Sequence, residues 1–172
     1  MKKAPALLLL ILSFSLAAWY HDSPNPTNEF VIKGKLKNEV TISLAELNSM
    51  VAVPIGNIKV TNHKGDVKEE IKNVYGVSFK NILSKAILPF EKPKELSSFY
   101  FVCIATDSHQ VVFSWNEIFN TDVGNNVYLI TEKNGIKLKD IPERILLLSK
   151  SDSLSGRRYL KNLKEVRVER VP

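Results

Sequence analysis

Hydrophobic and polar residues alternate along much of the chain, a pattern typical of half-buried strands. Phe30, Ile32 and Leu36 alternate with lysines, and after a turn at 38–39 the alternation resumes over 40–44. Further strands are predicted at 58–60, 74–77, 99–105, 111–113, 127–131, 136–138, 145–148 and 166–171. The last of these is expected to be an edge strand, whereas the polar stretch 62–72 is expected to be a loop.

The predicted helices are few and short. Apolar residues recur at the spacing of one helix face between Phe79 and Ile87, so a helix is expected there. Ser78 is its expected N-cap, and a proline lies two residues beyond its end. Shorter helices are predicted after Ser43 and Ser114, because each serine is followed three residues later by a glutamate, as in a capping box.

These elements together predict the α+β class. Strands outnumber helices, hairpin signals such as Asn134-Gly135 are frequent, and strands do not alternate with helices as they do in a parallel α/β sheet. The chain has 172 residues, no internal repeat and no low-complexity stretch. One folded domain is therefore expected, over residues 30–172.

Residues 1–18 have the character of a secretory signal peptide. Two lysines precede an apolar run over 6–18, which is short for a membrane span, and small residues predict cleavage after Ala17 or Ala18. An uncleaved N-terminal anchor is the alternative. Residues 19–29, rich in proline and asparagine, are expected to be a flexible tether. With no second long apolar run, the sequence predicts a periplasmic or extracellular protein without a membrane span after cleavage.

The formal charge of +6 does not indicate a nucleic-acid partner. Two of the positive charges lie in the predicted signal peptide, which leaves 22 basic against 18 acidic side chains. The remaining lysines alternate with acidic and apolar residues and form no basic stripe of the kind that nucleic-acid binding requires. A solvated surface is the simpler interpretation, and no nucleic-acid binding is expected.

Cysteine chemistry is limited to one residue. Cys103 cannot form an internal disulfide, and it lies inside the apolar run 99–105, so it is expected to be a small buried hydrophobic residue. The sequence contains no Gly-rich phosphate loop, no Gly-x-Ser-x-Gly elbow and no His-Glu-x-x-His motif. No metal site is predicted from the scattered histidines.

Five residues or groups remain as candidates for binding. Gly156, Arg157 and Arg158 form a polar loop that either clamps an anion through the guanidinium groups or carries solvated charges. His63 is either a ligand or proton carrier, or an exposed loop residue. His109 follows Asp107 in a turn, where the pair supports a metal or a proton relay, or else makes ordinary turn hydrogen bonds.

Five segments also occur in an order that has a counterpart in a known family. They are VTISLAEL at 40–47, IKVTNHKG at 58–65, VYGVSFKNILSKA at 74–86, VCIATDSHQVVFSWNEI at 102–118, and ILLLS with SGRRYLKNLKEVRV over 145–168. Together they extend over nearly the whole predicted domain. In this order and spacing the chain resembles the molybdopterin-binding domain of sulfite-oxidase-like enzymes.

The resemblance implies a mixed β-sheet curled around a molybdopterin cofactor, with the metal bound by a pterin dithiolene and one protein cysteine. A soft thiolate suits molybdenum and tunes its potential. Here Asn62 or His63 stands where the cysteine would fall, and the family's Asp-Gly-Tyr turn reads Asp-Ser-His at 107–109. The loop implied to grip the pterin phosphate is partly retained, as Gly-Arg-Arg at 156–158.

The sequence therefore predicts an exported, molybdopterin-binding-domain-like protein that lacks the thiolate ligand. It is expected to bind a pterin, another small anionic ligand or a protein partner in the corresponding cleft, without molybdenum–thiolate chemistry. A periplasmic molybdenum-dependent oxidoreductase with an atypical metal site is one alternative. A purely structural envelope protein is the other.

Overall fold

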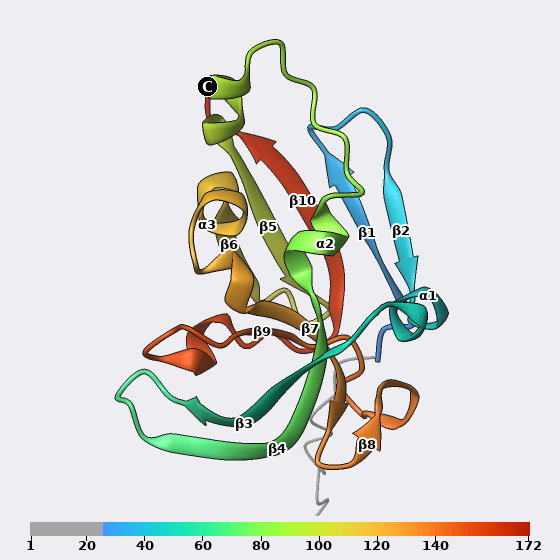
Figure 1. The fold of residues 1–172 in the computed structure, drawn as a ribbon, viewed down its shortest axis with the longest axis vertical. Coiled ribbons are helices and arrows are strands. Elements are labelled where there is room, and N and C mark those ends of the chain that lie inside the picture. The colour runs from blue at the N-terminus through green and yellow to red at the C-terminus, as the bar shows by residue number, and fades with distance from the viewer. Residues whose placement is uncertain (1–25) are drawn as a thin grey trace, which may run out of the picture.

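Two five-stranded sheets form the body of the protein in a computed structural model that describes residues 26–172 (Figure 1). The predicted signal peptide and most of the predicted tether lie outside the described residues. The first sheet contains β1 (Glu29–Gly34), β2 (Val40–Ser43), β5 (Phe99–Ala105), β6 (Gln110–Ser114) and β10 (Leu163–Arg170). The second contains β3 (Val53–Thr61), β4 (Val67–Ser78), β7 (Val127–Lys133), β8 (Ile136–Lys137) and β9 (Leu147–Ser149).

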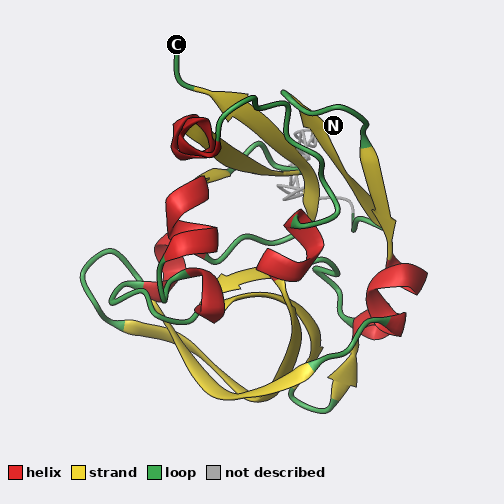
Figure 2. Ribbon diagram, turned by 45° about the horizontal axis from the view of Figure 1, so that its top comes forward, coloured by secondary structure: helices red, strands yellow, loops and turns green. Residues whose placement is uncertain are grey.

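The first sheet is mixed and the second is antiparallel. The strand order of the first sheet is β2-β1-β10-β5-β6, in which only β1 and β10 pair in parallel. In the second sheet β3, β4, β7 and β8 follow one another, and β9 also pairs with β7. Figure 2 shows the long strands of the second sheet curling strongly.

Short helices connect the strands. They are α1 (Leu44–Ser49), α2 (Phe79–Leu83) and α3 (Trp115–Asn120), with 3-10 turns η1 (Pro93–Ser98), η2 (Gly124–Asn126), η3 (Leu138–Asp140) and η4 (Ser155–Arg158). At α3 the predicted capping box is complete, because Ser114 Oγ accepts from Glu117 N and the Glu117 carboxylate accepts from Ser114 N. At α1 the serine half forms, with Glu46 N donating to Ser43 Oγ at 3.1 Å.

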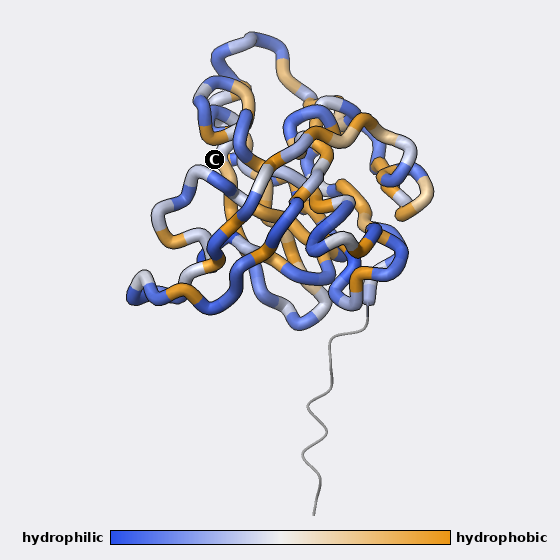
Figure 3. Tube along the Cα trace, turned by 60° about the horizontal axis from the view of Figure 1, so that its bottom comes forward, coloured by the Kyte–Doolittle hydropathy of each residue, from blue (hydrophilic) through white to orange (hydrophobic). Residues whose placement is uncertain are grey.

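The buried residues form two hydrophobic cores. The larger core lies between the two sheets: it includes the buried phenylalanines of β1, β5, β6 and α2 and Cys103, together with residues of the second sheet such as Val77, Val127 and Leu129. The smaller core lies within the curl of the second sheet and is closed by residues such as Leu146, Leu148 and Tyr159. In Figure 3 hydrophilic residues prevail along the outer loops.

The predicted α+β class is confirmed, and most predicted strands appear near their expected positions. The prediction for α2 was wrong in length, because the helix ends at Leu83 and the chain continues through tight turns, such as Ala86 N to Leu83 O at 3.0 Å. Ser78 makes no side-chain cap, and part of the polar stretch 62–72 is strand β4. No helix within residues 26–172 has both the length and the hydrophobicity that crossing a membrane requires.

The C-terminal strand β10 is central in its sheet, not at an edge as predicted. Its alternation places Val166 and Val168 in the core, while parallel pairing with β1 and antiparallel pairing with β5 occupy both of its sides. Alternation reports which face of a strand is buried, but it carries no information on which strands lie beside it. The expected position at an edge therefore had no basis in the side-chain pattern itself.

Candidate functional site

The predicted residues Asn62 and His63 lie in the tight turn between β3 and β4. The Asn62 side chain shapes this turn: its Oδ1 accepts from Lys64 N at 2.8 Å and from Asp66 N at 3.0 Å, and its Nδ2 donates to Asp66 Oδ2 at 2.9 Å. His63 and Lys64 are exposed at the tip. Asn62 thus stabilises the turn, and the side chains of His63 and Lys64 beside it face solvent.

The loop that contains Gly156 packs directly against the end of β3. Ser155 Oγ donates to Lys59 O at 2.7 Å and accepts from Thr61 N at 3.1 Å, so one hydroxyl satisfies two backbone groups of this edge strand. Gly156 lies so close that a Cβ there would stand 2.0 Å from Thr61 O. Sequence reasoning did not single out Ser155, because its partners lie more than ninety residues away.

These contacts bring several predicted residues into one place. The tip of the β3–β4 turn also adjoins the loop, since a Cβ at Gly65 would stand 3.9 Å from Leu154 Cδ2. We call this surface the hairpin–loop patch, and its members are Asn62, His63, Lys64, Gly156 and Arg157. The predicted anion-binding residues at 62–63 and 156–157 are therefore neighbours in space.

Arg158 turns away from the patch into a hydrogen-bonded network. Its Nε and Nη2 donate to the two carboxylate oxygens of Asp152 at 2.7 and 2.6 Å, and its Nη1 donates to Glu117 Oε1 at 3.0 Å. The guanidinium also lies 4.4 Å from the centre of the Phe113 ring. Burial is the largest single influence and raises the pKa of Asp152, but the hydrogen bonds from Arg158 and Ser149 and the positive charge of Arg158 together outweigh it, so the pKa is lowered. Arg158 therefore fastens η4 to α3.

Replacement of Arg158 with methionine is expected to lower the free energy of unfolding by about 2 kcal/mol, because it leaves the half-buried Asp152 carboxylate without its bidentate partner. Arg157→Met is the matched control, with a change below about 0.5 kcal/mol, since this side chain is exposed. Urea unfolding of both variants measures the difference. Equal losses in the two variants would contradict the structural role assigned to Arg158.

His109 lies apart from the patch in the turn between β5 and β6. Asp107 Oδ1 accepts from His109 N at 2.9 Å, and His109 O accepts from Ala105 N at 2.9 Å. The histidine is exposed, and no hydrogen bond or ion pair within residues 26–172 joins it to the hairpin–loop patch. The geometry here is that of turn hydrogen bonding, and a role of His109 in ligand binding stays a prediction.

Cys103 lies in the larger core, between Val166 of β10 and Val111 of β6. Burial raises the pKa of its thiol far above the ordinary range, so the thiolate is not available as a ligand. Among the described residues no three His, Cys, Asp or Glu side chains gather as a metal site. The side chains near the turn at 62–66 likewise include no thiolate, so the residues present do not fit a molybdenum–thiolate centre.

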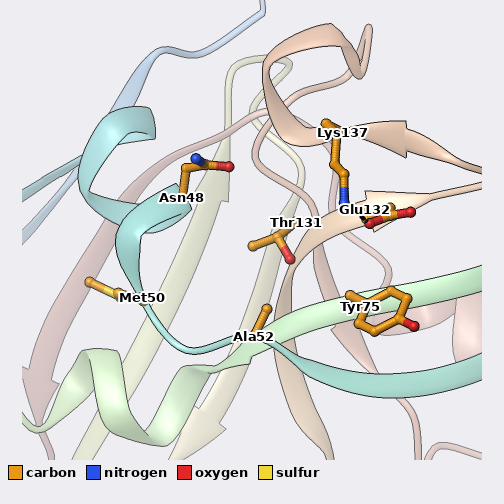
Figure 4. Close-up of a pocket in the computed structure, with 7 residues that line it drawn as sticks. All are labelled: Asn48, Met50, Ala52, Tyr75, Thr131, Glu132 and Lys137. Atoms are coloured by element: carbon orange, nitrogen blue, oxygen red, sulfur yellow. Dashed lines mark hydrogen bonds and ion pairs between the residues drawn. The ribbon is translucent and has the colours of Figure 1, made fainter.

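A separate hollow of about 520 Å³ lies between α1 and the strands of the second sheet (Figure 4). It is lined by Asn48, Met50, Ala52, Tyr75, Thr131, Glu132 and Lys137. Lys137 forms an ion pair with Glu132, so these two charges cancel within the hollow and do not favour the anion that the sequence predicts. None of the sequence-predicted residues lines it, and its residues come from segments that no sequence motif connects.

Comparison with known proteins adds evidence on the fold. No family model matches the sequence, and no curated protein matches it. Among solved structures, the sulfane dehydrogenase SoxCD from Paracoccus pantotrophus matches with a TM-score of 0.59 and 14% identity. The match covers 81% of this chain and 37% of that chain. This likeness supports the predicted α+β, sulfite-oxidase-like fold at the level of the backbone alone, and the chain spans little more than a third of the matched protein.

Proposed function

We propose that this chain is an exported binding module that holds a pterin or another small anionic ligand at the hairpin–loop patch, without molybdenum–thiolate chemistry. One observation carries the proposal. Arg157 is exposed and has no ion-pair partner among the described residues, next to the turn that exposes His63 and Lys64. Its neighbour Arg158 is held by two carboxylates and keeps the loop in place.

The chemistry of the patch favours a phosphate or carboxylate group. A guanidinium donates two parallel hydrogen bonds to such a group, and Lys64 adds a point charge from the facing turn. The Gly156 backbone packs against β3, and the Ser155 hydroxyl bonds to the same strand, so Arg157 starts from a fixed position. A fixed starting position lowers the entropy cost of binding. A protein partner with an exposed acidic group would meet the same requirements.

Arg157→Ala is expected to weaken binding of pterin-6-carboxylate and of inorganic pyrophosphate by about tenfold, the usual value of a lost charge-assisted hydrogen bond. Arg157→Lys keeps the positive charge but loses the two parallel N–H donors of the guanidinium, so a threefold weaker affinity is expected, to within about a factor of two. Titration calorimetry at low salt measures both. Lys139→Ala, an exposed lysine elsewhere, is the control with unchanged affinity. Equal affinity in the wild type and Arg157→Ala would refute the assignment.

The alternative is a molybdenum-dependent oxidoreductase with an atypical metal site, which the likeness to a sulfane dehydrogenase structure favours. Metal analysis of protein purified from its native host separates the two proposals. Molybdenum near one atom per chain, retained in Cys103→Ala, would favour the oxidoreductase and place its ligand outside the core. Metal-free protein that still releases a pterin or other anion on denaturation supports the binding module.

A further inference from the structure

Residues of α2, of α3 and of the segment after α2 line an apolar groove. Figure 1 shows α2 and α3 on the same side of the first sheet. The volume of the groove is about 380 Å³, and its floor includes Phe101 of β5. The walls are mostly apolar side chains, among them Leu83, Ile87, Phe90, Leu96, Trp115 and Phe119. Ile87 is 53% exposed and Phe90 is 44% exposed, so large hydrophobic side chains meet solvent at the mouth of the groove.

The exposure of this groove contrasts with the sequence pattern. Ile87 belongs to an apolar series that predicts a buried helix face, yet α2 ends at Leu83 and leaves this residue on the surface. Trp115 and Phe119 stack at 5.3 Å between ring centroids and form the opposite wall. A concave apolar surface with exposed aromatic and branched side chains is typical of an interaction site.

The backbone hydrogen bonding of the first sheet limits the kind of segment that can bind in the groove. Strand β5 at the floor pairs with β10 on one side and β6 on the other, so its backbone groups are already hydrogen-bonded. The walls offer side chains and no free strand edge. A segment that enters the groove must therefore satisfy its own backbone hydrogen bonds, and an amphipathic α-helix does so.

The charged residues near the groove indicate which charge a bound helix should carry. Along 80–95 the chain carries four lysines and two glutamates, of which Lys85 pairs with Glu46 and Glu95 pairs with Arg170. In the segment between Phe90 and Leu96, which both line the groove, this leaves Lys92 and Lys94 against Glu91. A second copy of the same surface, related by two-fold symmetry, would bring lysines against lysines, which opposes self-association. Acidic flanks on the bound helix match this rim.

We propose that the groove between α2 and α3 docks an amphipathic helix of a partner protein, with apolar residues on one face and acidic residues beside them. The apolar face fills the space between Phe90 and Trp115. The acidic flanks face Lys92 and Lys94, which lie in the segment between the lining residues Phe90 and Leu96. This surface shares no residue with the hairpin–loop patch, so the inference is independent of the proposed anion-binding function.

Two synthetic 18-residue helical peptides test the proposal on the full mature protein. Both carry the same leucine and phenylalanine stripe at helical spacing, and one has glutamate flanks where the other has lysine flanks. Fluorescence anisotropy is expected to show at least tenfold tighter binding of the glutamate peptide. Phe90→Ser and Ile87→Ser, both exposed, are expected to weaken it by about tenfold, whereas Val112→Ser, an exposed apolar residue outside the groove, leaves it unchanged.

A charge-reversal variant distinguishes specific binding from non-specific hydrophobic association. Lys92→Glu with Lys94→Glu is expected to reverse the preference between the two peptides. Equal binding of both peptides, or binding that Phe90→Ser leaves intact, overturns the proposal. A dimer in sedimentation equilibrium at micromolar concentration, dissolved by Phe90→Ser, also overturns it and assigns the groove to a second copy of this chain.

Discussion

Replacing Gly156 with alanine is expected to lower the free energy of unfolding by about 3 kcal/mol and to abolish the anion binding that we propose for the hairpin–loop patch. The added Cβ would stand 2.0 Å from Thr61 O and 3.1 Å from Thr61 C, and both atoms belong to the backbone of β3. The strand cannot retreat easily, because Ser155 bonds to it at Lys59 and Thr61. The loop must therefore detach and move Arg157 with it.

Urea unfolding and calorimetric titration of the same samples measure the two effects. Gly56→Ala is the matched control: Gly56 has a φ of +90° but nothing within 4 Å of a Cβ, so only backbone strain of about 1 kcal/mol is expected, with unchanged ligand affinity. If Gly156→Ala is no less stable than Gly56→Ala, the loop does not rest on β3 as the structure describes. If Gly156→Ala keeps its ligand affinity, binding does not depend on the position in which this loop holds Arg157.

Local patterns predicted several of the local elements. The apolar run at 99–105 is a buried strand, and the Ser114–Glu117 pair caps α3 from both directions, because these features depend on residues a few positions apart. The division into two sheets and the central place of β10 depend on pairing between distant segments. A strand with one apolar face has the same alternating sequence at the edge of a sheet and in its middle. Alternation alone therefore could not predict the division into two sheets or the central place of β10.

The same distinction applies to the candidate site. The resemblance in motif order pointed to 62–63 and 156–158, and the structure brings the turn and the loop together. It could not reveal that Arg158 is held by Glu117, forty-one residues away, and by Asp152. Two adjacent arginines look equivalent in sequence, yet one is a structural link and the other is exposed, because the loop turns one side chain inward.

Glu143 is expected to be the strongest electrostatic contributor to stability and to set its response to acid. Lys133 Nζ lies 3.0 Å from Glu143 Oε2 with its side chain only 7% exposed, and Lys161 Nζ lies 3.0 Å from Glu143 Oε1. Burial by itself raises the pKa of Glu143, but the hydrogen bonds from Lys161 and Lys133 outweigh it and lower this pKa to about 2.

Glu143→Gln is therefore expected to cost about 2 kcal/mol at pH 7, because it leaves the buried Lys133 ammonium with only Glu69, at 3.9 Å. Glu132→Gln is the matched control, since its partner Lys137 is largely exposed and such a pair contributes less than about 0.5 kcal/mol. Urea unfolding at pH 7 measures both. Equal costs would show that burial of Lys133 does not strengthen the Glu143 pair.

The acid dependence gives the same interaction a second signature. Because the pKa of Glu143 is lower in the folded protein than its usual 4.5, the stabilisation is present above that value and is lost as the pH falls toward 2. Between pH 7 and pH 3 the wild type is expected to lose about 1–2 kcal/mol more than Glu143→Gln, which has no carboxyl group to protonate at this position. If the wild type and Glu143→Gln lose the same free energy of unfolding over this pH range, Glu143 keeps an ordinary pKa, and Glu69 is the carboxylate that stabilises the buried Lys133 ammonium.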